Sequence, residues 1–176
     1  MQADTTGETL LVDGKAGTHM RVGATGHQNV PPQAREYVTR AANAVLGQLD
    51  GDLVGVSSLA AGGDQIFASL VLEQGGRLEV VLPCKGYETT FSSPEDLRNF
   101  HALLERAATV ETLGFDEPSE DAYLAAGCRV VDLSEMLLAI WDGQPARGKG
   151  GTGDVVEYAR RRGVRLEIVW PKGIVR

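Results

Sequence analysis

Long apolar runs, an excess of positive charge and a framework of cysteines are all absent from this sequence of 176 residues. No run approaches the about 20 apolar residues needed to cross a bilayer, and the first residues lack the basic-then-apolar order of a signal peptide. The two cysteines, Cys84 and Cys128, lie far apart without CxxC or His-rich spacing, which argues against disulfides and a zinc cluster. We therefore expect a cytoplasmic protein with no membrane partner, no bound metal and no cofactor.

The charge balance is acidic, with 17 Lys and Arg against 24 Asp and Glu and a formal net charge of -7. Non-specific binding to nucleic acid consists mostly of phosphate neutralisation, so nucleic acid is not expected as a partner. The length and the 43% of hydrophobic residues are those of one domain of ordinary size. Glycine, with 22 residues, clusters at the ends of apolar runs, as expected where a backbone approaches a ligand.

Residues 1–19 are polar and small and show no sustained period, so we interpret them as a tail. The apolar residues 10–12 before an Asp-Gly pair allow the alternative of one arm of a hairpin. The letters GTHM at residues 17–20 also resemble a vector-derived cloning junction, which would make Met20 the native start. Residues 20–176 are then expected to form a single domain.

From Met20 onward, short apolar runs alternate with helical patterns. Strands are expected at residues 21–24, 53–57, 78–82, 110–113, 136–141 and 166–170, with a helix in each interval. This alternation implies right-handed crossovers and parallel strands. The predicted fold is α/β, a doubly wound Rossmann-like parallel sheet of five to six strands with helices on both faces. Because such folds bind ligands beyond the carboxyl ends of their strands, function is expected in the loops that follow the strands.

The loop after the first strand, residues 23–29, combines small residues with polar ones. Gly23 and Gly26 allow backbone N–H groups to approach a ligand, and Thr25 and His27 offer side-chain hydrogen bonds. The alternative is a tight strand-to-helix turn with an exposed histidine.

The loop after the second strand, SSLAAGGD at residues 57–64, leads directly into a helix. Free N–H groups and the helix dipole at such a junction form a phosphate site, to which Ser58 would add a hydroxyl. Asp64 is favoured as a cap of its own helix over a catalytic acid. After the third strand, Lys85 and Tyr87 either reach a phosphate or a base or only close the loop.

The loop after the fifth strand has five glycines within residues 143–153, ahead of a helix. A GxxxxGK match is set aside because Gly150 stands where magnesium binding needs Ser or Thr. A GxGxxG match is weak because the chain ends before a complete dinucleotide unit. An anion-binding helix start remains, with Asp154 and Glu157 on neighbouring helix positions. Their alternative role is compensation of the helix dipole.

The segments SSLAAGGD (57–64) and GGTGDVVE (150–157) resemble the SGLAxGxD and GGxGTxxE motifs of the SLOG superfamily. This superfamily of Rossmann-like domains includes the LOG, or lysine decarboxylase-like, phosphoribohydrolases and DNA processing protein A. The resemblance implies binding of a nucleotide or nucleotide derivative across the strand ends, in a homodimer. By the same resemblance, Glu157 inherits a role beside the N-glycosidic bond. Asp154 replaces the Thr of the motif, and no residue matches the catalytic arginine of those enzymes, although Arg147 lies near the motif.

The leading hypothesis is a small nucleotide-binding protein, and the alternative is a metal-independent nucleoside 5′-monophosphate phosphoribohydrolase. A module that binds single-stranded DNA fits poorly with the charge of -7. The expected catalytic carboxylates are Glu157 and Asp154. The expected nucleotide contacts are Gly23, Thr25, Gly26, His27, Ser58, Leu59, Ala60, Gly62, Gly63, Asp64, Asp142, Gly148, Gly150, Gly151, Thr152 and Gly153.

Overall fold

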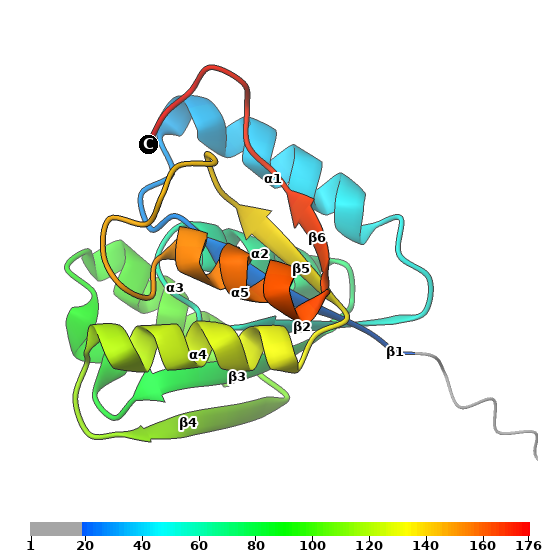
Figure 1. Cartoon of the computed structure of the whole chain (residues 1–176). Helices are drawn as coiled ribbons and strands as arrows, with labels where there is room; N and C mark the ends of the chain where they lie inside the picture. Colours follow the sequence, from blue (N-terminus) through cyan, green and yellow to red (C-terminus); the bar gives the residue numbers. More distant parts are fainter. Residues whose placement is uncertain (1–18) are drawn as a thin grey trace, which may run out of the picture.

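The computed structural model describes residues 19–176 as alternating strands and helices (Figure 1). The expected tail and its two alternatives concern residues 1–18, which lie outside the described residues; His19 already belongs to the first strand. The strands are β1 (His19–Gly26), β2 (Asp52–Ser57), β3 (Arg77–Cys84), β4 (Thr109–Phe115), β5 (Met136–Ile140) and β6 (Arg165–Ile168). The helices are α1 (Pro32–Leu46), α2 (Gly63–Glu73), the 3-10 turn η1 (Tyr87–Thr90), α3 (Pro94–Glu105), α4 (Glu120–Asp132) and α5 (Thr152–Arg162).

The six strands form one sheet in the order β4-β3-β2-β1-β5-β6, and each neighbouring pair is parallel. The predicted doubly wound α/β fold is confirmed. The strand order reverses between β1 and β5, because the chain first winds outward to β4 and then returns to the other side of β1. Such a switch leaves a crevice between the loops that follow the two central strands.

Helices cover both faces because each helix has one apolar stripe. On α1 the stripe is Ala34, Val38, Ala42 and Leu46, which packs with α2 against β1 and β5. On the other face, α4 and α5 pack against each other and over the middle of the sheet, in front of it in Figure 1. The central strand β5 is therefore buried along its whole length, which explains its entirely apolar sequence, whereas the edge strands β4 and β6 stay largely exposed and carry charged residues.

Local signals explain where the helices begin and end. Ser93 precedes α3, and its Oγ accepts a hydrogen bond from the N–H of Asp96 at 3.3 Å, as an N-cap serine does. Gly163 ends α5 with a φ of 68°, after three arginines in the last turn.

In the part of the chain that the structure describes, no helix is both long and apolar enough to span a bilayer.

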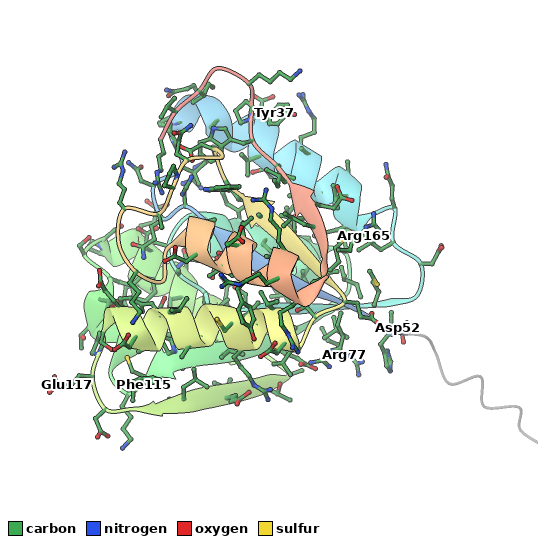
Figure 2. The ribbon with its side chains drawn as sticks, viewed as in Figure 1. Tyr37, Asp52, Arg77, Phe115, Glu117 and Arg165 are labelled. Atoms are coloured by element: carbon green, nitrogen blue, oxygen red, sulfur yellow. The ribbon has the colours of Figure 1, made fainter. Side chains whose placement is uncertain are left out.

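The two ends of the sheet differ in what they carry. Figure 2 shows Asp52, Arg77 and Arg165, the first residues of β2, β3 and β6, at one end, and Phe115 and Glu117 at the other. The second end is the one where all six parallel strands finish. The long glycine-rich loops lie at that end, so the fold brings together the loops in which the sequence places function.

Candidate functional site

A cleft of about 500 Å³ lies at the carboxyl ends of the central strands. Its walls come from the ends of β1, β2 and β3, from α4, from the loop between β5 and α5, and from Arg176. The cleft therefore crosses the β1/β5 switch point, where a doubly wound fold binds its ligand. Ten of the predicted contact residues line it: Thr25, Gly26, His27, Ser58, Ala60, Asp64, Gly148, Gly150, Gly151 and Thr152.

The other predicted residues surround the cleft without lining it. Gly23 lies within β1, facing Ser134, and Leu59 is fully buried. Three more pack behind the walls: Gly62, Gly63 and Gly153. The role of these residues as ligand contacts stays a prediction.

Three of the glycines bring two loops into close contact. The Cα of Gly63 lies 2.9 Å from where a Cβ on Gly26 would stand, and a Cβ on Gly62 would lie 2.5 Å from the carbonyl oxygen of His27. The N–H of Gly63 donates to that same carbonyl at 2.9 Å. These glycines therefore fit the β1–α1 loop onto the start of α2, and the glycine signal in the sequence has a packing cause as well as a functional one.

The loop before α2 uses its own polar groups. Ser57 Oγ accepts from the N–H of Leu59 at 3.0 Å and donates to Asp64 Oδ2 at 3.3 Å. The Asp64 carboxylate also accepts from the N–H groups of Ser58 and Ala60. The residue that caps α2 is Gly62, so Asp64 serves the loop and not the helix terminus. Several N–H groups that the sequence offers to a phosphate are thus occupied by this chain itself.

Asp64 is a buried carboxyl group beside the cleft, with 5% of its surface exposed. Burial raises its pKa from 3.8 to about 7, and the hydrogen bonds from the loop only partly oppose this. A titratable group of this kind in a cleft is a candidate functional residue.

His27, Asp142 and Arg176 form a second polar network. His27 Nε2 lies 2.8 Å from Asp142 Oδ1, and His27 Nδ1 lies 2.9 Å from Arg176 Nη1. Because arginine only donates, Nδ1 accepts and the proton of the neutral ring lies on Nε2, which donates to Asp142. Through these contacts Arg176 binds to the loop after β1, which contains His27, and that loop binds to the loop after β5, which contains Asp142. The exposed histidine of the turn alternative does not occur, since only 2% of the His27 side chain is exposed.

The His27 network makes a prediction about acid stability. Burial lowers the pKa of His27 below 6.5 more strongly than Asp142 raises it, and Arg176 lowers it further. The unfolded chain therefore takes up a proton first as the pH falls below about 6.5, so the contribution of His27 to the free energy of unfolding is expected to fall between pH 7.5 and 5. Urea unfolding of the unchanged protein and of His27→Gln at both pH values checks this as a difference, followed by tryptophan fluorescence, to which Trp170 contributes with its ring edge-on to that of His27 at 5.2 Å.

The control separates His27 from the other histidines. His27→Gln is expected to lose this part of the pH dependence, whereas His101→Gln, at a half-exposed histidine, is expected to keep it. An identical slope in His27→Gln and the unchanged protein would contradict the network.

The start of α5 offers N–H groups to the cleft. The carbonyl of Gly151 accepts from Asp154 and Val155, and Asp154 Oδ2 accepts from the N–H of Gly150 at 2.9 Å. The N–H groups of Thr152 and Gly153, in the first turn, have no intrahelical acceptor, and no described residue accepts from them. Gly150 has a φ of 83°, which allows the loop to turn into the helix beside α4. This geometry is typical of an anion site at a helix N-terminus.

Three cationic side chains line the cleft although the chain as a whole is acidic: Arg147, Lys149 and Arg176. Lys149 pairs with Asp121, and Arg147 donates to the backbone oxygen of Arg176 at 3.3 Å. Arg176 Nε is buried 3.8 Å from Asp142 Oδ2 and makes no hydrogen bond to any described residue.

Among the described residues, no cluster of side chains suited to a metal ion is present.

The two predicted catalytic carboxylates lie outside the lining of the cleft. Glu157 has 54% of its side chain exposed and pairs with Arg160 at 3.8 Å. Asp154 holds the glycine loop through Gly150. Their catalytic roles stay predictions, and both positions agree with the alternative of a structural or dipole role.

Several cleft residues were not among the expected contacts. The sequence contains features that could have indicated two of them: Tyr87 follows the third strand, and Arg147 is a basic residue in the glycine-rich loop. Glu120 and Tyr123 reach the cleft from α4, where sequence periodicity indicates only a helix. Arg176 follows the last strand by eight residues, and no pattern in the sequence places it beside His27.

Solved structures share this architecture. DNA processing protein A from Streptococcus pneumoniae matches with a TM-score of 0.64 and 17% identity, over 89% of this chain and 52% of that chain. The fold is that of DNA processing protein A. The same protein from Helicobacter pylori, described by its single-stranded DNA binding mode, matches with a TM-score of 0.61 and 16% identity over 85% of this chain and 64% of that one.

The structural-genomics protein TM1055 matches with a TM-score of 0.53 and 13% identity, over 84% of this chain and 72% of that one. The SLOG resemblance is thus confirmed at the level of the fold. No family model and no curated protein matches the sequence. This chain spans about half the length of the Streptococcus DNA processing protein A, the 52% given above. Because one neighbour binds single-stranded DNA, the expectation against nucleic acid gains no support from the comparisons.

Proposed function

We propose that the cleft binds a nucleotide or nucleotide derivative, with its phosphate at the start of α5. The observation that carries this proposal is the meeting of the unoccupied N–H group of Thr152, at the start of α5, with Arg147, Lys149 and Arg176 in one cleft of an acidic protein. A helix N-terminus and nearby cations together favour a dianionic group. The SLOG-like fold supports the same class of ligand.

The size of the cleft agrees with this ligand class. Its walls run from the end of β3 to the start of α5, which follows β5. These strands are three intervals apart in the sheet, about 14 Å at the usual strand spacing. A phosphate bound at α5 therefore leaves room for a sugar and a base toward β3.

The test is calorimetric titration with nucleoside 5′-monophosphates and with the matching nucleosides. Monophosphates are expected to bind, and nucleosides at least about tenfold more weakly, because a charge-assisted contact to phosphate contributes roughly 1.5–3 kcal/mol. Arg147→Gln is expected to weaken monophosphate binding, whereas Arg165→Gln, at the opposite end of the sheet, is the matched control. Equal binding of nucleosides and monophosphates would contradict the phosphate site.

The second candidate is hydrolysis of the N-glycosidic bond of a nucleoside monophosphate. The observation that favours it is the buried Asp64 carboxyl in the cleft, because a carboxyl with a pKa near neutrality is suited to proton transfer. Chromatography of free base released from the same monophosphates tests it, with Asp64→Asn, which is expected to lose the release, and with Glu157→Gln and Asp154→Asn beside the unchanged protein. An unchanged rate in both variants would exclude the two carboxylates from the reaction.

An oligonucleotide belongs in the same panel. Binding of single-stranded DNA that weakens with added salt and is competed by nucleoside monophosphates would place DNA in this cleft. The homodimer and the cytoplasmic location stay predictions; sedimentation analysis addresses the former.

A further inference from the structure

Two buried titratable groups line the cleft on the side away from the phosphate site. Asp64 follows β2 and Tyr87 follows β3, whereas the open N–H groups of α5 follow β5. Asp64 is 5% exposed and Tyr87 is 7% exposed, so both face the cleft with only a small part of their surface. Whatever part of a ligand lies far from its phosphate will meet these two side chains.

No charged side chain contributes to the ionisation of Asp64. The groups that act on its pKa are the Ser57 hydroxyl of β2 and the N–H groups of the loop before α2, and the charge of ionised Asp64 in turn raises the pKa of Tyr87 in η1. The other titratable groups of the cleft come from the β1–α1 loop, α4, the glycine loop and the C-terminal segment: His27, Glu120, Tyr123, Arg147, Lys149 and Arg176. None of these six changes the pKa of Asp64, which burial raises to about 7. The cleft thus holds a carboxyl group that is neutral in a large fraction of molecules near pH 7.

The oxygens of Asp64 already accept hydrogen bonds from Ser57 and from the loop before α2, so the neutral carboxyl group has its O–H left to donate. Tyr87 adds a hydroxyl that can donate or accept, and burial together with the nearby Asp64 raises its pKa, so it stays protonated. The chemical group complementary to such a pair has an acceptor next to a donor in one plane, as at the edge of a nucleobase. A phosphate or a carboxylate would offer only acceptors.

We infer that Asp64, in its neutral form, and Tyr87 recognise the edge of the nucleobase of a nucleotide whose phosphate lies at α5. This inference rests on the proposed function. It adds that the nucleobase is the part of the ligand that is recognised, and that Asp64 and Tyr87 recognise it. It also makes binding proton-linked, since ionised Asp64 has lost the hydrogen that it donates to the base. The affinity is then expected to fall about tenfold between pH 6 and pH 8, as the neutral fraction of a group titrating near pH 7 does.

The experiment is calorimetry at pH 6 and pH 8 with adenosine, guanosine, cytidine and uridine 5′-monophosphates and with ribose 5-phosphate, which lacks a base. The second ionisation of the phosphate, near pH 6, affects every ligand and variant alike. Asp64→Asn keeps a planar donor and acceptor but cannot ionise, and Asp50→Asn, exposed in the loop before β2, is the matched control.

For at least one monophosphate, the ratio of the affinity at pH 6 to the affinity at pH 8 is expected to be about tenfold larger in the unchanged protein than in Asp64→Asn. Asp50→Asn is expected to show the same ratio as the unchanged protein. Titration in two buffers of different ionisation enthalpy is expected to show proton uptake on binding. Proton uptake by a monophosphate in excess of that by ribose 5-phosphate needs no variant, so this comparison decides the inference even if Asp64→Asn fails to fold.

Three results would overturn the inference. A monophosphate that binds without proton uptake and without the pH effect would remove Asp64 from base recognition and leave the phosphate site intact. Ribose 5-phosphate binding with the same affinity and pH effect would show that the base is not read. If neither the monophosphates nor ribose 5-phosphate bind, the proposed function fails and this inference fails with it.

Discussion

Replacing Gly62 with alanine is expected to lower the free energy of unfolding by about 3–4 kcal/mol. Gly62 has a φ of 77°, a left-handed conformation that costs alanine roughly 1–2 kcal/mol. A Cβ there would also lie 2.5 Å from the His27 carbonyl oxygen and closer still to that of Gln28. These are backbone atoms, so relief requires the β1–α1 loop to move, and with it one wall of the cleft.

Gly75 provides a matched control for this substitution. It has the same φ of 77°, but nothing lies within 4 Å of the place where its Cβ would stand. Gly75→Ala is therefore expected to cost only the conformational part, roughly 1–2 kcal/mol, in the same urea unfolding measurement. Equal losses for the two variants would contradict the close packing of the β1–α1 loop on α2.

Replacing Asp64 with asparagine is expected to change how stability depends on pH. Between pH 4 and 7 the folded protein holds a proton on Asp64, whose pKa is raised to about 7, while the unfolded chain releases it near 3.8. The folded state binds more protons in this window, so the contribution of Asp64 to stability falls as the pH rises through it. The loss is complete above about pH 8 and amounts to about 4 kcal/mol for a shift of this size.

Urea unfolding of the unchanged protein and of Asp64→Asn at pH 4, 6 and 8 measures this effect as a difference. Because the His27 contribution has the opposite direction and is common to both proteins, it cancels in the difference. Asp50→Asn is expected to follow the unchanged protein, since Asp50 is exposed. A difference between the Asp64→Asn variant and the unchanged protein that stays constant from pH 4 to 8 would show that the Asp64 carboxyl ionises normally.

Periodicity predicted the six strands, with end positions that differ by up to a few residues. The strand expected at residues 166–170 ends at Ile168, and the strand expected at residues 110–113 continues to Phe115. Such ends depend on which backbone groups find a partner in the folded chain, which a hydrophobic pattern does not specify.

Glycine spacing predicted where the cleft lies better than it predicted which single residues line it. Gly148, Gly150 and Gly151 line it, as expected, but Gly62 and Gly63 pack against another loop. The sequence signal is the same in both cases, because a close neighbour excludes a Cβ whether that neighbour is a ligand or the chain itself. For the same reason the N–H groups before α2 look available in the sequence and are occupied in the fold.

The sequence by itself determined the alternation of strands and helices, and hence the parallel sheet with its loops gathered at one end, because the period of apolar residues reflects local geometry. Only the tertiary structure decided which side chains meet there. It buried Asp64 and Tyr87 in the lining of one cleft, joined Arg176 to His27 and left Glu157 in solvent. These outcomes depend on strand order and burial, which bring together residues up to 149 positions apart and determine the pKa of each carboxyl group.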